Sequence, residues 1–191
     1  MTEFTIADVA GAPTEAVRPL RLLLLDVDGV LTDGRLFLTD SGEEIKAFHS
    51  RDGHGIKMLI ASGIEVGIVT GRSSRVVQKR AQDLGISLLV QGCHDKRAAV
   101  LSILAERGLA SQEAAFMGDD VIDLPAMQSV GFAIAPADAH PLVRARAHWV
   151  TRHGGGMGAV REFCELLMYA QGTLDDQMQS VYRGDCSWAG G

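Results

Sequence analysis

The stretch LRLLLLDVDG, residues 20–29, decides the fold of this chain. It is an apolar run too short for an independent helix, and two carboxylates, Asp26 and Asp28, lie at its end. Similar short apolar runs recur along the chain, separated by segments in which apolar residues follow a helical pattern. Strands that alternate with helices indicate βαβ units and a buried parallel sheet. We predict strands at 20–27, 64–70, 86–90, 114–117 and 131–135, and helices at 52–62, 73–85, 95–108, 119–129 and 156–172.

One segment interrupts this alternation directly after the first strand. Residues 34–50, GRLFLTDSGEEIKAFHS, contain two strand-like runs around the turn TDSGE, which predicts an antiparallel hairpin. The insertion is too small to be a cap domain. The predicted fold is a Rossmann-like three-layer α/β/α sandwich with a parallel sheet. We place an N-terminal arm at 1–19, the domain at 20–172 and a C-terminal tail at 173–191.

The composition narrows the functional classes. The chain has 24 acidic and 18 basic side chains and a formal charge of −6, which argues against a large basic surface for nucleic acid. No apolar run approaches the roughly 20 residues of a membrane span, and the first twenty residues do not resemble a secretory signal. Cys93, Cys164 and Cys186 are odd in number and lack metal-ligand spacing, so we expect a reduced, cytoplasmic environment.

Acidic residues follow two of the predicted strands. Asp26 and Asp28 could share one side of the first strand, where two nearby carboxylates require a proton or a bound cation. Asp119 follows the fourth strand, and helix capping explains Asp120 and Asp123 better than it explains Asp119. Open α/β sheets bind ligands outside the carboxyl ends of their strands. Carboxylate oxygens gathered there suit Mg²⁺, although a simple turn would explain Asp26 and Asp28 equally well on their own.

Two more polar residues belong to the same predicted edge. Thr70 ends the second strand, where a hydroxyl and free amides at a helix start can seat a phosphate; an ordinary helix cap is the equal alternative. Lys96 lies in the first turn of a predicted helix, where a cation opposes the helix dipole. It is either solvated or placed to neutralise a phosphate and a nucleophile.

Four motifs that follow one another along the chain resemble those of the haloacid-dehalogenase superfamily. There, the first aspartate attacks phosphorus, and the aspartate two residues on acts as general acid and then as general base. The resemblance implies that Asp26 is nucleophile and metal ligand, that Asp28 is the acid–base and binds Mg²⁺ through its backbone carbonyl, and that Asp119 is a further ligand. Mg²⁺ would neutralise the charge that develops in phosphoryl transfer. The motifs are Asp26-x-Asp28, Thr70, Lys96 and GDDVID at 118–123. The resemblance implies that Asp26, Asp28, Thr70 and Lys96 are catalytic. It also implies that Asp120 and Asp123 lie behind the metal ligands.

Within the superfamily, the chain resembles the capless phosphatases of 3-deoxy-D-manno-octulosonate 8-phosphate over roughly residues 20–180. The resemblance implies hydrolysis of that sugar-acid phosphate in the synthesis of lipopolysaccharide precursors. It also implies a homotetramer, in which hairpins and C-terminal tails meet neighbouring active sites; the glycine run 154–156 would be a flexible join that permits this. The implied substrate contacts are Asp28, His49, Ser50, Arg51, Asp52, Gly53, Lys57, Arg72, Arg80 and Lys96, with a merely solvated position as the alternative for Arg80.

Three other interpretations stay open at this stage. The same chemistry could act on a nine-carbon, sialic-acid-like 9-phosphate. A non-catalytic oligomerisation module of the same fold would have no need for the complete motif set. A response-regulator-like receiver domain also carries acids and a lysine at strand ends, but its phosphoacceptor lies on a later strand.

Overall fold

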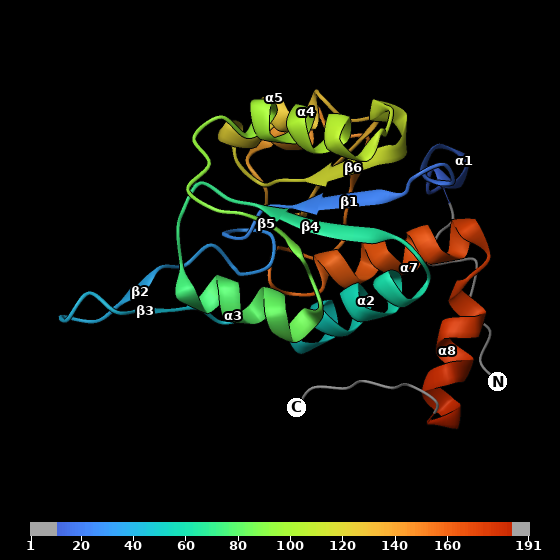
Figure 1. Ribbon diagram of the computed structural model, residues 1–191, viewed down its shortest axis with the longest axis horizontal. Helices are drawn as coiled ribbons and strands as arrows, with labels where there is room; N and C mark the ends of the chain where they lie inside the picture. The colour runs from blue at the N-terminus through green and yellow to red at the C-terminus, as the bar shows by residue number, and fades with distance from the viewer. Residues whose placement is uncertain (1–10, 185–191) are drawn as a thin grey trace.

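The computed structural model describes residues 11–184 and contains a parallel sheet between two layers of helices (Figure 1). The strands of this sheet are β1 (Leu22–Leu25), β4 (Glu65–Val69), β5 (Leu88–Val90), β6 (Ala114–Met117), β7 (Phe132–Ala135) and β8 (Trp149–Val150). Their order is β5-β4-β1-β6-β7-β8, and every pair is parallel. The first apolar run therefore becomes a strand of a parallel sheet, as predicted, and it lies near the centre of that sheet. The two-residue β8 is too short to leave a pattern, and the sequence did not predict it.

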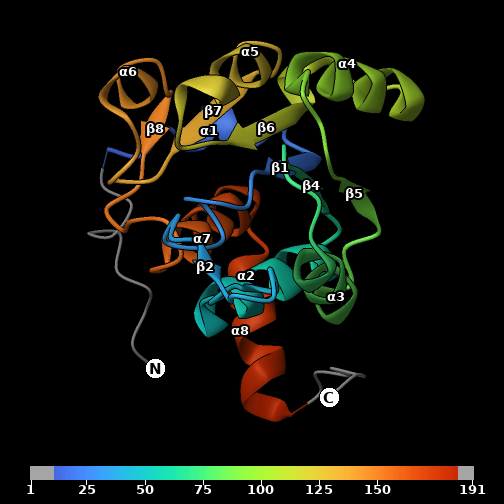
Figure 2. The same ribbon diagram turned by 90° about the vertical axis from the view of Figure 1, so that its left-hand side faces the viewer.

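Helices cover both faces of the sheet, and Figure 2 shows the sheet between the two layers. One layer contains α2 (Ser50–Ala61), α3 (Arg75–Leu84) and α7 (Ala159–Gln171), and the other contains α4 (Lys96–Arg107), α5 (Leu124–Met127) and α6 (Pro141–Arg144). Side chains of β1 alternate between the two cores: Leu23 and Leu25 pack with the first layer, whereas Leu22 and Leu24 pack with the second. The predicted three-layer sandwich is confirmed. The predicted helix 119–129 is divided into a 3₁₀ turn, η3 (Val121–Asp123), and α5; another such turn, η2 (Ser111–Glu113), precedes β6.

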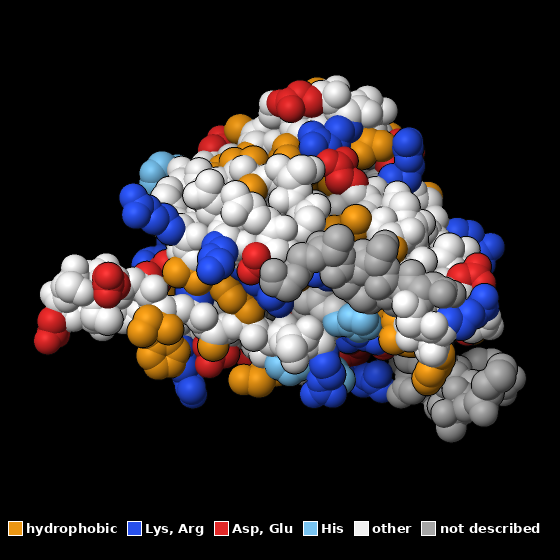
Figure 3. Space-filling view, turned by 60° about the horizontal axis from the view of Figure 1, so that its bottom comes forward, with side chains coloured by type: hydrophobic (Ala, Val, Ile, Leu, Met, Phe, Trp, Pro, Cys, Tyr) orange, Lys and Arg blue, Asp and Glu red, His pale blue; other side chains and the backbone are white. Residues whose placement is uncertain are grey.

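The predicted hairpin is present and projects from the body of the molecule (Figure 1). Its strands β2 (Phe37–Leu38) and β3 (Glu44–Ile45) are antiparallel, with Phe37 opposite Ile45. Hydrophobic side chains gather on this hairpin (Figure 3). Leu36, Phe37, Leu38 and Ile45 are 47–62% exposed. Solvent-exposed apolar residues and unpaired strand edges of this kind favour association with another chain.

Both flanking segments contain a helix. The N-terminal arm includes α1 (Thr14–Val17), whose Val17 is buried in the core. The C-terminal tail includes α8 (Leu174–Arg183), of which Leu174 is buried and Met178 packs partly against the core. The rest of the predicted arm and tail, residues 1–10 and 185–191, lies outside the described residues. Across residues 11–184, no helix is long and apolar enough to cross a membrane.

Candidate active site

Three carboxylates meet at the carboxyl edge of the sheet, the edge at which its parallel strands end. Asp26 directly follows β1, and its backbone N–H donates to the carbonyl of Met117 at 3.0 Å. Asp119 follows β6, which pairs with β1, and Asp123 ends η3. One carboxylate oxygen from each of Asp26, Asp119 and Asp123 lies within 4.8 Å of the other two. Asp26 and Asp119 thus lie together, as their positions at the ends of strands predicted, and Asp123 joins them.

The loop after β1 reaches these carboxylates because residue 29 is glycine. Gly29 has a φ of +88°, and a Cβ built on it would lie 2.1 Å from Oδ2 of Asp119. Any side chain would therefore collide with Asp119 and also strain the backbone. The Asp-x-Asp-Gly sequence is a turn, as one interpretation held, and the turn brings the loop after β1 against Asp119.

Lys96 is buried among the acids and is not a solvated cation. Its side chain is 4% exposed, and its Nζ lies 2.6 Å from Oδ1 of Asp123 and 2.9 Å from Oδ1 of Asp26. Burial by itself would lower the pKa of Lys96, but the two carboxylates outweigh burial and raise it. A cation in the first turn of α4 destabilises the helix start. Asp95 stabilises the same helix start, because its Oδ1 accepts from the backbone N–H of Ala98 and caps α4.

Asp123 organises the loop that carries Asp119. It is fully buried, and its Oδ2 accepts from the backbone N–H groups of Asp119 at 3.1 Å and Asp120 at 3.2 Å. Asp120 is exposed and caps η3 through the N–H of Val121. Capping therefore accounts for Asp120. Asp123 binds the loop through Oδ2 and pairs with Lys96 through Oδ1.

Three carboxylates at this edge are paired with a single lysine, and a divalent cation would neutralise the remaining negative charge. Burial, followed by the charge of Asp123, raises the pKa of Asp26 to about 6, although Lys96 opposes the shift. Burial and the charges of Asp123, Asp26 and Asp120 raise the pKa of Asp119 to about 7. Oδ1 of Asp119 is buried without a hydrogen-bond partner. Clustered hard oxygen donors with an unused buried oxygen fit Mg²⁺, which neutralises such repulsion.

The side chain of Asp28 belongs to a second charged group next to these acids. Its Oδ1 forms an ion pair with Lys46, which the hairpin supplies, and its Oδ2 lies 3.8 Å from Nε of Arg72. Glu44 joins the two cations, at 3.0 Å from Lys46 Nζ and 3.3 Å from Arg72 Nη2. Arg72 comes from the segment after β4, in which Thr70 is buried and its Oγ1 accepts from the N–H of Arg72 at 3.5 Å. The hairpin is thereby connected to the Asp-x-Asp segment.

Sequence reasoning assigned no role to Glu44 or Lys46. A period-two signal was available, because residues 44 and 46 of a strand share one face while Ile45 occupies the other. In the structure Ile45 is exposed, whereas Lys46 contacts Asp28 and Glu44 contacts Lys46 and Arg72. A strand of two residues is too short for that alternation to stand out from chance.

Known proteins resemble this chain over most of its length. A family model described as haloacid dehalogenase-like hydrolase matches residues 89–162. The 3-deoxy-D-manno-octulosonate 8-phosphate phosphatase of Escherichia coli (strain K12) is 51% identical over 157 residues, which cover 82% of this chain and 84% of the relative. This chain belongs to the haloacid dehalogenase-like hydrolases.

Solved structures of this hydrolase family include close structural matches. The phosphatase of the same name from Yersinia pestis is 47% identical with a TM-score of 0.83, and the match covers 88% of this chain and 89% of the other. The Moraxella catarrhalis phosphatase, solved in complex with a magnesium ion, a phosphate ion and a KDO molecule, is 39% identical with a TM-score of 0.86. That match covers 88% of this chain and 97% of the other.

The hydrolase uses Asp52 to hold two helices together, which differs from its predicted contact with substrate. Asp52 lies on α2 and is buried. Its Oδ1 accepts from the N–H of Arg161 at 2.8 Å, and its Oδ2 accepts from the N–H of Gly158 at 3.2 Å. Both oxygens therefore cap the start of α7. Gly53 beside it is also buried, and a Cβ there would lie 2.2 Å from Nη2 of Arg80. Asp52 and Gly53 therefore pack between helices, and their contact with substrate stays a prediction.

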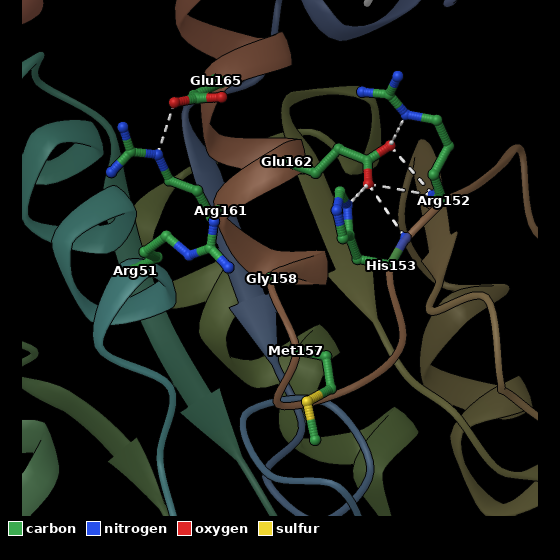
Figure 4. A pocket seen from close by; sticks show the side chains of 8 residues that line it. All are labelled: Arg51, Arg152, His153, Met157, Gly158, Arg161, Glu162 and Glu165. Carbon is green, nitrogen blue, oxygen red and sulfur yellow. Dashed lines mark hydrogen bonds and ion pairs between the residues drawn. The ribbon is translucent and has the colours of Figure 1, made fainter.

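The other predicted substrate contacts on α2 and α3 lie apart from the three carboxylates. Arg80 is half-buried and lies over the ring of Phe48, 5.5 Å from its centroid, so it is not simply solvated. Arg51 borders a hollow of about 370 Å³ between α2 and α7, which Figure 4 shows. His49, Ser50 and Lys57 lie at the start of α2 and along it. The hollow therefore places Arg51 beside the start of α7 rather than among the carboxylates.

The glycine run of the hydrolase, residues 154–156, packs tightly against the loop after β1 and is not a flexible linker. A Cβ on Gly155 would lie 1.8 Å from the carbonyl oxygen of Gly29. The N–H of Gly156 donates to the carbonyl of Val30 at 2.9 Å, and the N–H of Gly155 donates to Oδ1 of Asp138 at 2.9 Å. Absent side chains let residues 154–156 lie directly against the loop after β1. The earlier expectation of flexibility here was wrong, because glycine also permits close packing of backbones.

Proposed function

We propose that the chain is a Mg²⁺-dependent phosphatase that forms an aspartyl-phosphate on Asp26. The observation that carries this proposal is the position of Lys96, which pairs with Asp26 in a buried site beside two further carboxylates. A lysine there can hold a negatively charged phosphoryl group against a carboxylate nucleophile. A purely structural ion pair would not need the unpartnered oxygen of Asp119.

In the proposed reaction, an oxygen of Asp26 attacks phosphorus while the bond between phosphorus and the leaving alcohol breaks. Asp28 gives its proton to the leaving oxygen, so the alcohol departs neutral. Asp28 then takes a proton from a water molecule, which attacks phosphorus and releases inorganic phosphate from Asp26. Thr70 and the amides after it are placed to hold the phosphate oxygens.

Asp26, Asp119 and the backbone carbonyl of Asp28 would hold Mg²⁺. The bound ion supplies neutralisation of the charge on the phosphoryl oxygens. Asp123 is committed to Lys96 and to two backbone N–H groups, so we place it behind the ligands.

The proposed substrate is 3-deoxy-D-manno-octulosonate 8-phosphate, which is converted to the free sugar acid and phosphate for lipopolysaccharide precursors. The support is the identity of 51% with the Escherichia coli phosphatase and the sugar acid bound in the Moraxella catarrhalis relative. Arg72 is exposed and lies beside Asp28, where its guanidinium can bind the substrate carboxylate through two parallel hydrogen bonds. Arg51, Lys57 and Arg80 are the further proposed contacts, together with His49 and Ser50.

The active protein is proposed to be a cytoplasmic homotetramer with its active sites at subunit contacts. The apolar arm of residues 36–45 supports association because its exposed side chains need a partner surface. A site without a cap domain also needs walls from another source to select its substrate.

Steady-state turnover of a panel of sugar phosphates with Mg²⁺ tests the proposal, and a nine-carbon sugar-acid 9-phosphate in the panel separates the nearest alternative. Asp26→Asn is expected to keep the fold and lose turnover, and acid-quenched wild-type protein should carry phosphate on Asp26. Asp120→Asn is the matched control, since Asp120 is exposed and asparagine still caps η3. Retention of more than a few per cent of activity by Asp26→Asn would exclude this nucleophile.

A further inference from the structure

A lysine on the projecting hairpin is buried although the strand around it is exposed. The Lys46 side chain is 1% exposed, whereas that of the preceding Ile45 lies in solvent. The Lys46 ammonium group forms ion pairs with Asp28 and Glu44. Burial of a charge is costly unless it is paired, so these contacts fix where the lysine must lie.

The two oxygens of Asp28 face cations from two different parts of the chain. Lys46 directly follows β3 and contacts Oδ1, and Arg72, in the segment after β4, lies 3.8 Å from Oδ2. Arg72 is about half exposed, so it is accessible to a substrate, whereas Lys46 is enclosed. The exposed cation is suited to binding an anion, and the buried cation is suited to holding the Asp28 carboxylate in place.

The hairpin therefore has two faces with different tasks. The alternation points Lys46 toward Asp28 and Glu44 toward Lys46 and Arg72, whereas Ile45, which pairs with Phe37, is exposed. The arm is anchored to the Asp-x-Asp segment through charge, and its outer side is apolar. A rotation of the arm would carry the partner of Asp28 with it.

We infer that Lys46 is a positioning residue that holds the Asp28 carboxylate in line with the leaving oxygen, so that the hairpin sets the geometry of proton transfer. This inference rests on the proposed function, in which Asp28 takes a proton from the attacking water in one turnover and gives it to the leaving alcohol in the next as the phosphorus–oxygen bond breaks. The ion pair with Lys46 is that of the ionised Asp28, the form that accepts the proton. Lys46 itself touches neither phosphate nor sugar.

The choice of leaving group separates positioning from general structural support. A sugar alcohol needs a proton as it departs, whereas p-nitrophenolate is a stable anion and departs without one. A misplaced Asp28 therefore slows formation of the aspartyl-phosphate from the sugar ester much more than from p-nitrophenyl phosphate. The formation step is followed by single-turnover kinetics, because the later attack of water is common to both substrates.

Lys46→Met keeps the length of the side chain and removes its charge. We expect the formation rate from the sugar-acid phosphate to fall about 10- to 100-fold, within the usual contribution of general acid catalysis. We expect KM to stay within about threefold and the rate with p-nitrophenyl phosphate to fall far less. Lys46→Arg restores the ion pair and should recover most of the lost formation rate. This variant keeps the inference testable if Lys46→Met folds poorly. Glu43→Gln, an exposed change in the same hairpin, is the control.

Three results would overturn the inference. A higher KM at unchanged kcat would show that Lys46 binds substrate. Equal losses on both esters, or loss of the melting transition in Lys46→Arg as well, would show a structural role alone. Unchanged kinetics in Lys46→Met would remove Lys46 from the reaction. These results differ from failure of the proposed function, in which the wild-type protein itself releases no phosphate from any ester.

Discussion

Replacing Asp52 by alanine tests whether this residue holds α7 in place or contacts substrate. The change removes acceptors from two backbone N–H groups, those of Gly158 and Arg161, at the buried start of α7. Hydrogen bonds to a charged acceptor contribute ~1.5–3 kcal/mol each. Burial raises the pKa of Asp52, so part of this gain is offset by the cost of desolvating the carboxylate. We expect a net loss of about 2–4 kcal/mol, near or above the upper end for the loss of a helix cap.

Thermal unfolding measures this loss directly. For a chain of this size, ~1 kcal/mol lowers Tm by roughly 2–4 °C, so Asp52→Ala should melt about 5–15 °C below wild type. Asp52→Asn keeps one acceptor oxygen and should lose about half as much. Asp95→Ala is the comparison, because it removes an exposed cap with a single N–H partner and should cost about 1 kcal/mol. A Tm within about 2 °C of wild type, together with a raised KM for the phosphate ester, would refute the structural role.

The other predictions concern the metal, pH and the C-terminal segment. Chelation should abolish activity and Mg²⁺ should restore it, whereas Ca²⁺ should substitute poorly because it prefers more and longer oxygen contacts; full activity in chelator would contradict the metal site. The pKa of Asp119, raised to about 7 without metal, means that its ionised form destabilises the folded state at higher pH and that the penalty disappears as the group takes up a proton. Metal-free Asp119→Asn should therefore melt above wild type near about pH 8, and this advantage should shrink below about pH 7 and vanish only toward about pH 4, where the unfolded carboxyl is also protonated; a constant difference across that range would refute the assignment. Deletion from Gly172 onward should slow turnover of the sugar-acid phosphate more than that of p-nitrophenyl phosphate, and equal losses would show that this segment supplies no specificity.

The sequence predicted the sheet and the group of carboxylates because both depend on chain order. Parallel strands joined by helices place their carboxyl ends on one edge, so Asp26 and Asp119 had to approach one another once β1 and β6 became neighbours. The distances between the carboxylates, and the inclusion of Asp123 among them, depend on side-chain packing that no spacing in the sequence expresses.

The errors and omissions share a physical cause, which is contact between distant segments. Asp52 caps a helix that begins more than a hundred residues later, and local sequence cannot show such a partner. Lys46 directly follows a two-residue strand, and nothing in the local sequence shows that it contacts Asp28. The segment of α8 is largely polar and predicted a tail, yet Leu174 anchors it. Glycine permits both flexibility and close packing, and the surroundings alone decide between them.

The contact between Gly155 and Gly29 also constrains when the site can assemble during synthesis. Asp26 and its loop leave the ribosome early, whereas the backbone that packs on this loop, at residues 154–156, is made more than a hundred residues later. Domains fold largely as units, and contacts between distant segments form late. A nascent chain that stops before residue 154 carries Asp26, Lys96 and Asp119 but lacks the surface against which the loop rests. Catalytic competence should therefore arise abruptly once residues 154–156 have been made and can pack on the loop after β1.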